Sequence, residues 1–159
     1  MTVHIRDARP GDLEFIVRAN IGLAHESEDV HLDPALLRPG VAAVLEDRSL
    51  GRYFIAESEG TTIGQMMLTY EWSDWRNGVF WWIQSVFVEP DHRQKGVFST
   101  LYRHVAGLAE RTPEVCGLRL YVDRDNRSAR RIYAHLGLHD SNYEVMEKVF
   151  RGPASHREV

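Results

Sequence analysis

Cysteine is almost absent from this sequence, which excludes two classes of small protein. Cys116 is the only cysteine in 159 residues, so neither an intramolecular disulfide nor a cysteine-rich zinc site can form. The histidines show no metal-ligand spacing, and we predict no metal site. Long apolar runs are also missing. No run reaches the roughly 18 residues that cross a bilayer, and the N-terminus lacks a basic start followed by an apolar segment. We therefore predict a cytoplasmic protein with no membrane partner.

An excess of positive charge is missing as well. The chain has 19 Lys and Arg against 23 Asp and Glu, a formal net charge of −4. Because nucleic-acid binding usually needs a clustered basic face, we expect no nucleic-acid partner. What is present is the composition of a folded domain, 43% apolar and 26% charged. A chain of this length can bury one core. We predict a single domain over residues 1–150 and a loose tail over 151–159.

Hydrophobic periodicity switches between strand and helix along the chain. An alternating segment at 2–8 precedes helical stripes at 13–24 and, after Pro34, at 36–45. Strand-like runs at 52–60, 62–72 and 79–90 are joined by turn signals at Glu59-Gly60 and at 76–78, which predicts an antiparallel meander. A helix from 97 to 109, a strand at 116–123, a helix over 127–136 and a strand at 143–150 complete the pattern. For the helix over 127–136, Asp125 or Asn126 is the expected cap and Gly137 the expected C-terminal stop. Since a strand, a crossover helix and a further strand form a parallel unit, we predict an α/β (α+β) fold. Its central sheet is mixed and mostly antiparallel, with flanking helices.

The loop that enters the helix at 97 has the chemistry of an anion site. The first amides of a helix have no intrahelical partners, and the helix dipole adds partial positive charge there. A glycine permits close approach or an unusual backbone angle, and basic side chains add charge. We expect a phosphate or pyrophosphate to bind here, unless the segment is only a solvated basic helix start. The residues concerned are Arg93, Gln94, Lys95, Gly96, Val97, Phe98 and Ser99.

Two motifs, in this order, resemble the GNAT superfamily of acyl-CoA-dependent N-acyltransferases. "VFVEPDHRQKGVFSTLY" is similar to that family's pyrophosphate motif, R/Q-x-x-G-x-G/A, with Phe98 where a small residue is usual. "NRSARRIYAHLGL" is similar to its second motif, N-x-x-A-x-x-x-Y-x-x-x-G-F, with Leu138 in place of the aromatic residue. The resemblance covers nearly the whole chain and implies a GNAT-like fold.

The resemblance also implies acetyl-CoA as the cofactor. The strand before the loop would pair with the pantetheine arm, and the loop amides would hold the pyrophosphate. Tyr133 would act as the proton donor for the leaving thiolate, although its spacing alone also fits helix packing. Asn126 would contact the pantetheine, cap its helix, or do both. The implied cofactor-binding residues outside the loop are Val86, Phe87, Val88, Asn126, Ala129 and Tyr133.

An amine acceptor needs a group that takes its proton, because alkylamines are mostly protonated at neutral pH. Many relatives carry a glutamate where this chain has Gln84 and Ser85, and neither of these is a carboxylate. The proton would then leave through water or another residue. Unless they are only solvated surface carboxylates, the candidates for the base are Glu26, Glu28, Glu71 and Asp74. We place Glu26 first, because its loop borders the acceptor site in the fold that the resemblance implies.

Together these features predict an N-acetyltransferase that moves an acetyl group from acetyl-CoA to a primary amine by direct attack in a ternary complex. The acceptor would be a small-molecule or peptide amine. A non-catalytic acyl-CoA-binding regulatory module is the alternative, favoured by Gln84 and Ser85.

The tryptophans suggest a further surface. All four lie between positions 72 and 82, and the adjacent Trp81 and Trp82 must face opposite sides of a strand. One of the two would therefore serve a homodimer interface, cross-strand packing or an acceptor pocket. A protein–protein interaction domain built on this hairpin is the third functional class that the sequence leaves open.

Overall fold

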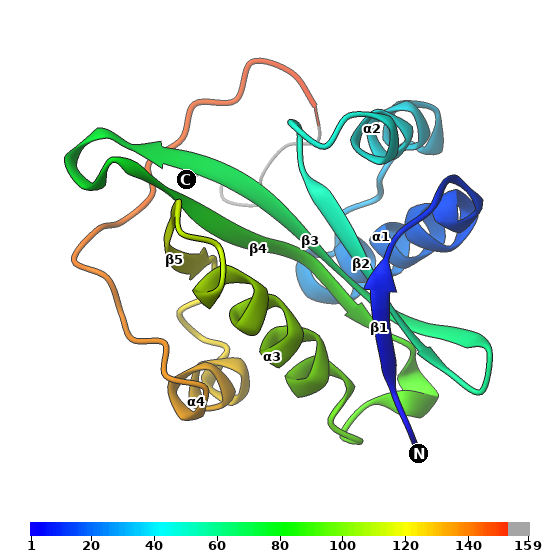
Figure 1. The fold of residues 1–159 in the computed structure, drawn as a ribbon. Helices are drawn as coiled ribbons and strands as arrows, with labels where there is room; N and C mark the ends of the chain where they lie inside the picture. Colours follow the sequence, from blue (N-terminus) through cyan, green and yellow to red (C-terminus); the bar gives the residue numbers. More distant parts are fainter. Residues whose placement is uncertain (153–159) are drawn as a thin grey trace. The chain divides into compact units, whose positions relative to one another are not determined.

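A computed structural model describes residues 1–152 as a five-stranded sheet with helices (Figure 1). The strands lie in the order β1-β2-β3-β4-β5. Their bounds are β1 His4–Asp7, β2 Arg52–Ser58, β3 Thr61–Ser73, β4 Gly78–Val88 and β5 Val115–Leu120. The helices are α1 Leu13–Glu28, α2 Pro34–Glu46, α3 Val97–Glu110 and α4 Arg127–His135, with short 3-10 turns η1 Pro10–Asp12, η2 Asp74–Arg76 and η3 Pro90–His92. The predicted order of elements up to α4 is confirmed.

The sheet is mixed, as predicted. Strands β1 to β4 pair antiparallel in chain order, and the β2–β3 turn places Glu59 and Gly60 at φ 52° and 76°, as a tight hairpin requires. At the start of β4, the Val79 amide donates to the Glu114 carbonyl over 2.8 Å. Further along both strands, the Arg119 guanidinium lies 3.7 Å from the centroid of the Phe80 ring. The residue numbers of the two strands therefore increase in the same direction, so β5 runs parallel to β4.

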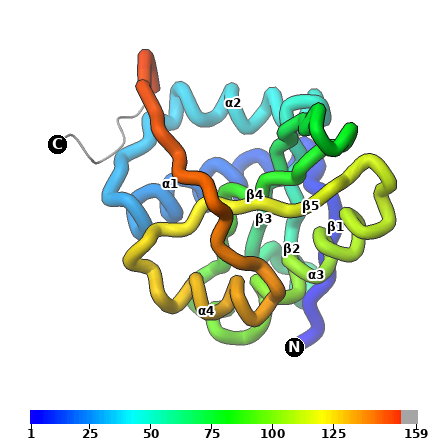
Figure 2. The backbone as a smooth tube through the Cα atoms, turned by 90° about the vertical axis from the view of Figure 1, so that its left-hand side faces the viewer, coloured from blue at the N-terminus to red at the C-terminus, as the bar shows by residue number. Residues whose placement is uncertain are grey.

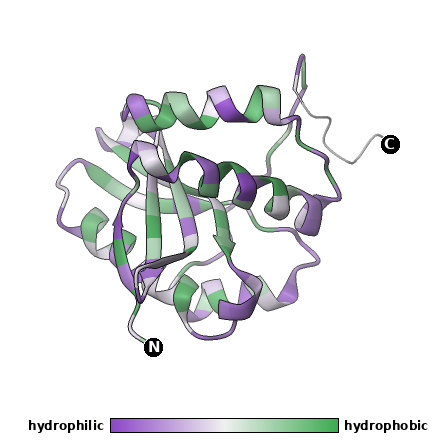
Figure 3. Cartoon of the chain, turned by 90° about the vertical axis from the view of Figure 1, so that its right-hand side faces the viewer, coloured by the Kyte–Doolittle hydropathy of each residue, from purple (hydrophilic) through white to green (hydrophobic). Residues whose placement is uncertain are grey.

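Alternate residues of β2 face two different helical layers. Tyr53 and Ile55 join a buried cluster with Ile16 and Val17 of α1 and Val41 of α2. Phe54, between them, lies 5.4 Å from the ring of His104 on α3. Since successive strand residues point to opposite faces, α1 and α2 cover one face of the sheet and α3 covers the other. The tube of Figure 2 and the hydropathy colouring of Figure 3 show α1 and α2 running side by side.

The chain divides into two compact units. The first, Met1–Arg119, holds α1 to α3 and nearly all of the sheet, and the second begins at Leu120 and holds α4. In the part of the chain that the structure describes, no helix is both long and apolar enough to cross a membrane.

The predicted strand at 143–150 is wrong. The structure assigns no strand there. Val145 and Met146, which would face opposite sides of a strand, are 66% and 96% exposed. Alternating side chains form a strand only when the backbone finds a partner, and no strand among residues 1–152 pairs with this segment. The tail predicted at 151–159 falls, from residue 153 onward, outside the described residues.

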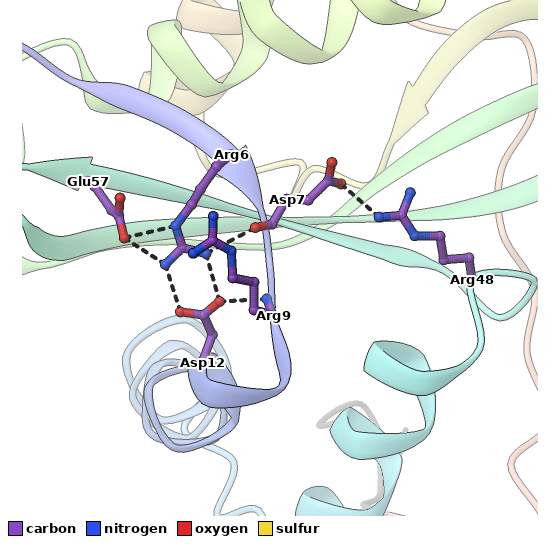
Figure 4. Close-up of polar contacts among 6 residues, drawn as sticks. All are labelled: Arg6, Asp7, Arg9, Asp12, Arg48 and Glu57. Atoms are coloured by element: carbon purple, nitrogen blue, oxygen red, sulfur yellow. Dashed lines mark hydrogen bonds and ion pairs between the residues drawn. The ribbon is translucent and has the colours of Figure 1, made fainter.

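Charged side chains hold the start of α1 against the sheet (Figure 4). Arg6 of β1 donates to both carboxylate oxygens of Asp12, over 2.8 and 2.9 Å, and to Glu57 of β2 over 2.6 Å. The backbone amide of Arg9 donates to Asp12 over 2.6 Å. Burial works to raise the pKa of Asp12, but the hydrogen bonds from Arg6 and Arg9 outweigh it and hold that pKa below its usual range. This network joins β1 and β2 to the N-terminal end of α1.

Candidate functional site

Strand β4 contains a bulge shortly before its end. The register shifts between the pairs Gln65–Phe87 and Met67–Gln84, so β4 has one residue more than β3 in this interval. Ser85 lies in the interval with a φ of 48°, a left-handed angle that is uncommon for a residue other than glycine. A bulge redirects the backbone and side chains that follow it. Here it directly precedes the segment that the resemblance assigns to the pantetheine arm.

A buried chain of polar groups supports this bulge. Gln65 is fully buried, and its Nε2 donates to Asn20 Oδ1 over 2.7 Å and to the carbonyl of Ser85 over 3.2 Å. Asn20 Nδ2 in turn donates to the Tyr53 hydroxyl over 3.2 Å. Burial raises the pKa of Tyr53, against the hydrogen bonds with Asn20 and Ser85. These hydrogen bonds link α1, β2 and β3 to the bulge. Sequence reasoning missed these residues, because each polar residue stands alone within an apolar pattern.

The loop before α3 has the backbone geometry of an anion site. Gln94 has a φ of 61° and Gly96, the N-cap of α3, a φ of 81°, with Lys95 between them. Left-handed residues alternating with ordinary ones turn successive N–H groups toward a common concavity, which is a nest for anions. A Cβ at position 96 would meet no atom within 4 Å, so the backbone angle and not space requires glycine there.

The other loop residues contribute differently. Arg93, Gln94, Lys95 and Gly96 are exposed, whereas the side chain of Val97 is buried in the core and leaves only its backbone for a ligand. Phe98 and Ser99 are half-buried. The amides at the start of this 14-residue helix lack i−4 partners. The loop therefore fits a diphosphate through its backbone, with charge added by its basic side chains.

Two residues predicted for separate roles meet beside this loop. Arg93 Nη2 donates to Glu26 Oε2 of α1 over 2.7 Å, and Arg93 Nε donates to the Val88 carbonyl over 2.9 Å. The same guanidinium lies 5.7 Å from the centroid of the Phe87 ring. The carboxylate proposed for the acceptor side thus touches an arginine proposed for the cofactor side.

A pocket of about 370 Å³ opens at the end of α1. Gly22 brings α1 close to β4, since a Cβ there would lie 3.4 Å from the Phe87 ring. The rings of His25 and His31 meet edge to face at 5.3 Å. Sequence reasoning missed both as site residues, because scattered histidines carry no signal until the fold brings them together. The pocket is lined by Ile21, Gly22, His25, Glu26, Val30, His31 and Leu32.

The other candidate bases lie elsewhere. Glu71 pairs with Phe80 at the far end of β4, where it accepts hydrogen bonds from Trp82 Nε1 over 2.5 Å and from Arg119 over 3.0 Å. The Trp82 bond, opposed by burial and helped by Arg119, lowers the pKa of Glu71 and makes it a weaker base. Asp74 accepts from its neighbouring amide at the same hairpin. Of the carboxylates considered from the sequence, the fold brings Glu26 to the phosphate loop and takes these two away from it.

The second unit carries the remaining predicted residues. Asn126 caps α4, as predicted, by accepting a hydrogen bond from the Ala129 amide over 3.0 Å. Ala129 and Tyr133 are half-buried. Burial raises the pKa of Tyr133, which makes its phenol a weaker acid than an exposed tyrosine. Gly137, at φ 89°, follows the end of the helix as predicted.

Comparisons with known proteins agree with this arrangement. The family model described as the acetyltransferase (GNAT) family matches residues 22–138. A comparison with curated proteins finds no match. A solved structure of a possible acetyltransferase from Clostridium difficile 630 is 38% identical, with a TM-score of 0.88 over 95% of this chain and 99% of that one. The ribosomal-protein-alanine N-acetyltransferase from Brucella melitensis biovar Abortus 2308 is 17% identical and shares the fold, with a TM-score of 0.73 over 94% of this chain and 100% of that one. The chain belongs to the GNAT acetyltransferase family.

Proposed function

We propose that the chain is an N-acetyltransferase that transfers the acetyl group of acetyl-CoA to a primary amine by direct attack in a ternary complex. The observation that carries the proposal is the contact of Glu26 with Arg93. It joins a pocket that contains a carboxylate to a loop that fits a diphosphate, beside the end of a bulged strand.

The residues of the first unit suit the cofactor. The backbone at 86–88 would pair with the pantetheine arm as an added strand, and the amides at 94–99 would hold the diphosphate. Lys95 adds positive charge at the exposed surface of the loop. Bound acetyl-CoA would supply an acyl carbon that is already activated as a thioester.

Proton transfers accompany the bond changes. Glu26 would accept the proton of the bound ammonium, which frees the nitrogen lone pair to attack, and the proton that the nitrogen loses as the C–N bond forms would pass to water. Tyr133 would donate its phenolic proton to the sulfur released when the C–S bond breaks. A covalent intermediate on Cys116 is not needed. That residue lies beside Gly78 at the start of β4, at the opposite end from the bulge.

The pocket lining also restricts the acceptor. Its aliphatic side chains, Ile21, Val30 and Leu32, surround one carboxylate and two imidazoles. A volume of about 370 Å³ is at the small end of ligand pockets. This favours a small amine with a short apolar body, whose nitrogen meets Glu26, over a bulky or strongly hydroxylated acceptor.

The test is acetyl-CoA turnover against a panel of amines, measured by thiol release, alongside calorimetric CoA affinity. We expect turnover of phenethylamine or hexylamine above that of spermidine, glucosamine or a lysine peptide. Glu26→Gln should lower kcat/KM at least about tenfold, while Glu28→Gln, outside the pocket lining, should not.

The regulatory module remains the second candidate, because Gln84 donates to Thr69 and Ser85 forms the bulge, so neither provides a base. Firm CoA binding without turnover of any amine would favour that module. Absence of CoA binding would reject both candidates.

A further inference from the structure

We infer that Arg93 is shared between the two substrates. In the structure Arg93 pairs with Glu26, and the geometry points to an exchange in which a diphosphate takes over Arg93 and leaves Glu26 to the amine. The inference rests on the proposed function and adds a coupling between its two binding events.

The position of Arg93 makes the exchange possible. Its backbone lies directly before Gln94, whose left-handed angle begins the anion nest, while its side chain reaches back to Glu26 and to the Val88 carbonyl. A rotation of the side chain is therefore enough to present the guanidinium to a ligand in the loop.

The strength of the present contact also permits it. The side chains of Arg93 and Glu26 are 42% and 45% exposed, and ion pairs at such exposure are weak because water and salt screen them. A diphosphate carries more negative charge than a carboxylate, and both can accept two parallel hydrogen bonds from a guanidinium. The competing ligand is thus the stronger partner for Arg93.

The same exchange changes what an amine meets in the pocket. While Arg93 contacts Glu26, an ammonium that approaches Glu26 also approaches a positive charge. After Arg93 turns to the loop, Glu26 presents an uncompensated negative charge from the pocket lining. Coupling between two sites is reciprocal, so cofactor and amine should each strengthen the binding of the other.

The experiment uses CoA alone, and so does not depend on knowing the acceptor. CoA is titrated calorimetrically into the full chain and into Glu26→Gln, which removes the competitor for Arg93. We expect Glu26→Gln to bind CoA about two- to fivefold more tightly, the range that an exposed ion pair supports. Pantetheine, which lacks the diphosphate, should bind both proteins equally.

Two further variants separate exchange from a general charge effect. Glu28→Gln makes the same change in net charge near the end of the same helix, and its CoA affinity should match that of the unmodified chain. In an Arg93→Gln background, Glu26→Gln should produce no tightening. Tightening that persists in that background, equal tightening by Glu28→Gln, or no tightening by Glu26→Gln would overturn the inference. Failure of the unmodified chain to bind CoA would instead overturn the proposed function.

Discussion

Replacing Gln65 with leucine tests whether the buried polar chain supports the β4 bulge. Leucine keeps most of the volume but donates no hydrogen bond, so Asn20 Oδ1 and the Ser85 carbonyl, now 2.7 and 3.2 Å from Gln65 Nε2, lose a donor. Each buried acceptor left unpaired costs about 1–3 kcal/mol. Part of this is recovered, because no group among the described residues donates to Gln65 Oε1, which the substitution removes. We expect a net loss of about 2–4 kcal/mol.

Urea unfolding followed by tryptophan fluorescence measures this loss. All four tryptophans lie between positions 72 and 82, in the same compact unit as Gln65, so the signal reports on the relevant unit. The melting temperature should fall by about 5–15 °C. Tyr53→Phe is the milder control, because it removes only the hydroxyl that accepts from Asn20. It should lower the free energy of unfolding by about 1 kcal/mol.

The same variant should lose CoA affinity if the bulge presents the strand end to the cofactor. A Gln65→Leu protein as stable as the unmodified chain would refute the reasoning, since two buried acceptors would then have lost their donor without cost. Reduced stability with unchanged CoA affinity would show that these buried hydrogen bonds stabilise the fold but do not contribute to CoA binding.

Three further predictions follow from single residues. Gly96→Ala places a side chain at a φ of 81° in open space, so strain of about 1–2 kcal/mol should weaken calorimetric CoA binding, and unchanged affinity would show that the loop backbone does not matter. Tyr133→Phe should lower kcat by about tenfold or more; if kcat is retained, the phenol is not the proton donor. The pKa of Asp12 is lowered in the folded chain, so its contribution to stability is complete above the unfolded value of about 3.9 and disappears as the pH falls through the lower folded value. Asp12→Asn should therefore flatten the acid limb of the stability curve below about pH 4, and a limb as steep as that of the unmodified chain would contradict this.

Local features of the sequence determined most of the secondary structure. The antiparallel meander, the cap at Asn126 and the glycine after α4 depend on residues close to one another in the chain, and they were predicted correctly. Gly96 was expected to permit either close approach or an unusual backbone angle, and its φ of 81° is the second of these. The strand at 143–150 failed, because pairing requires a partner backbone that an alternating pattern cannot supply. The two motifs were sufficient to indicate the family.

Only the tertiary structure decided which distant side chains meet. Glu26 and Arg93 are 67 residues apart in the sequence, and Asn20 and Gln65 are 45 apart. In each pair, however, the two side chains form a hydrogen bond of 2.7 Å. Periodicity and motifs are properties of neighbours along the chain and do not record contacts between separate elements. Those contacts depend on how helices and strands pack, and they decide which charges and hydrogen bonds the candidate site combines.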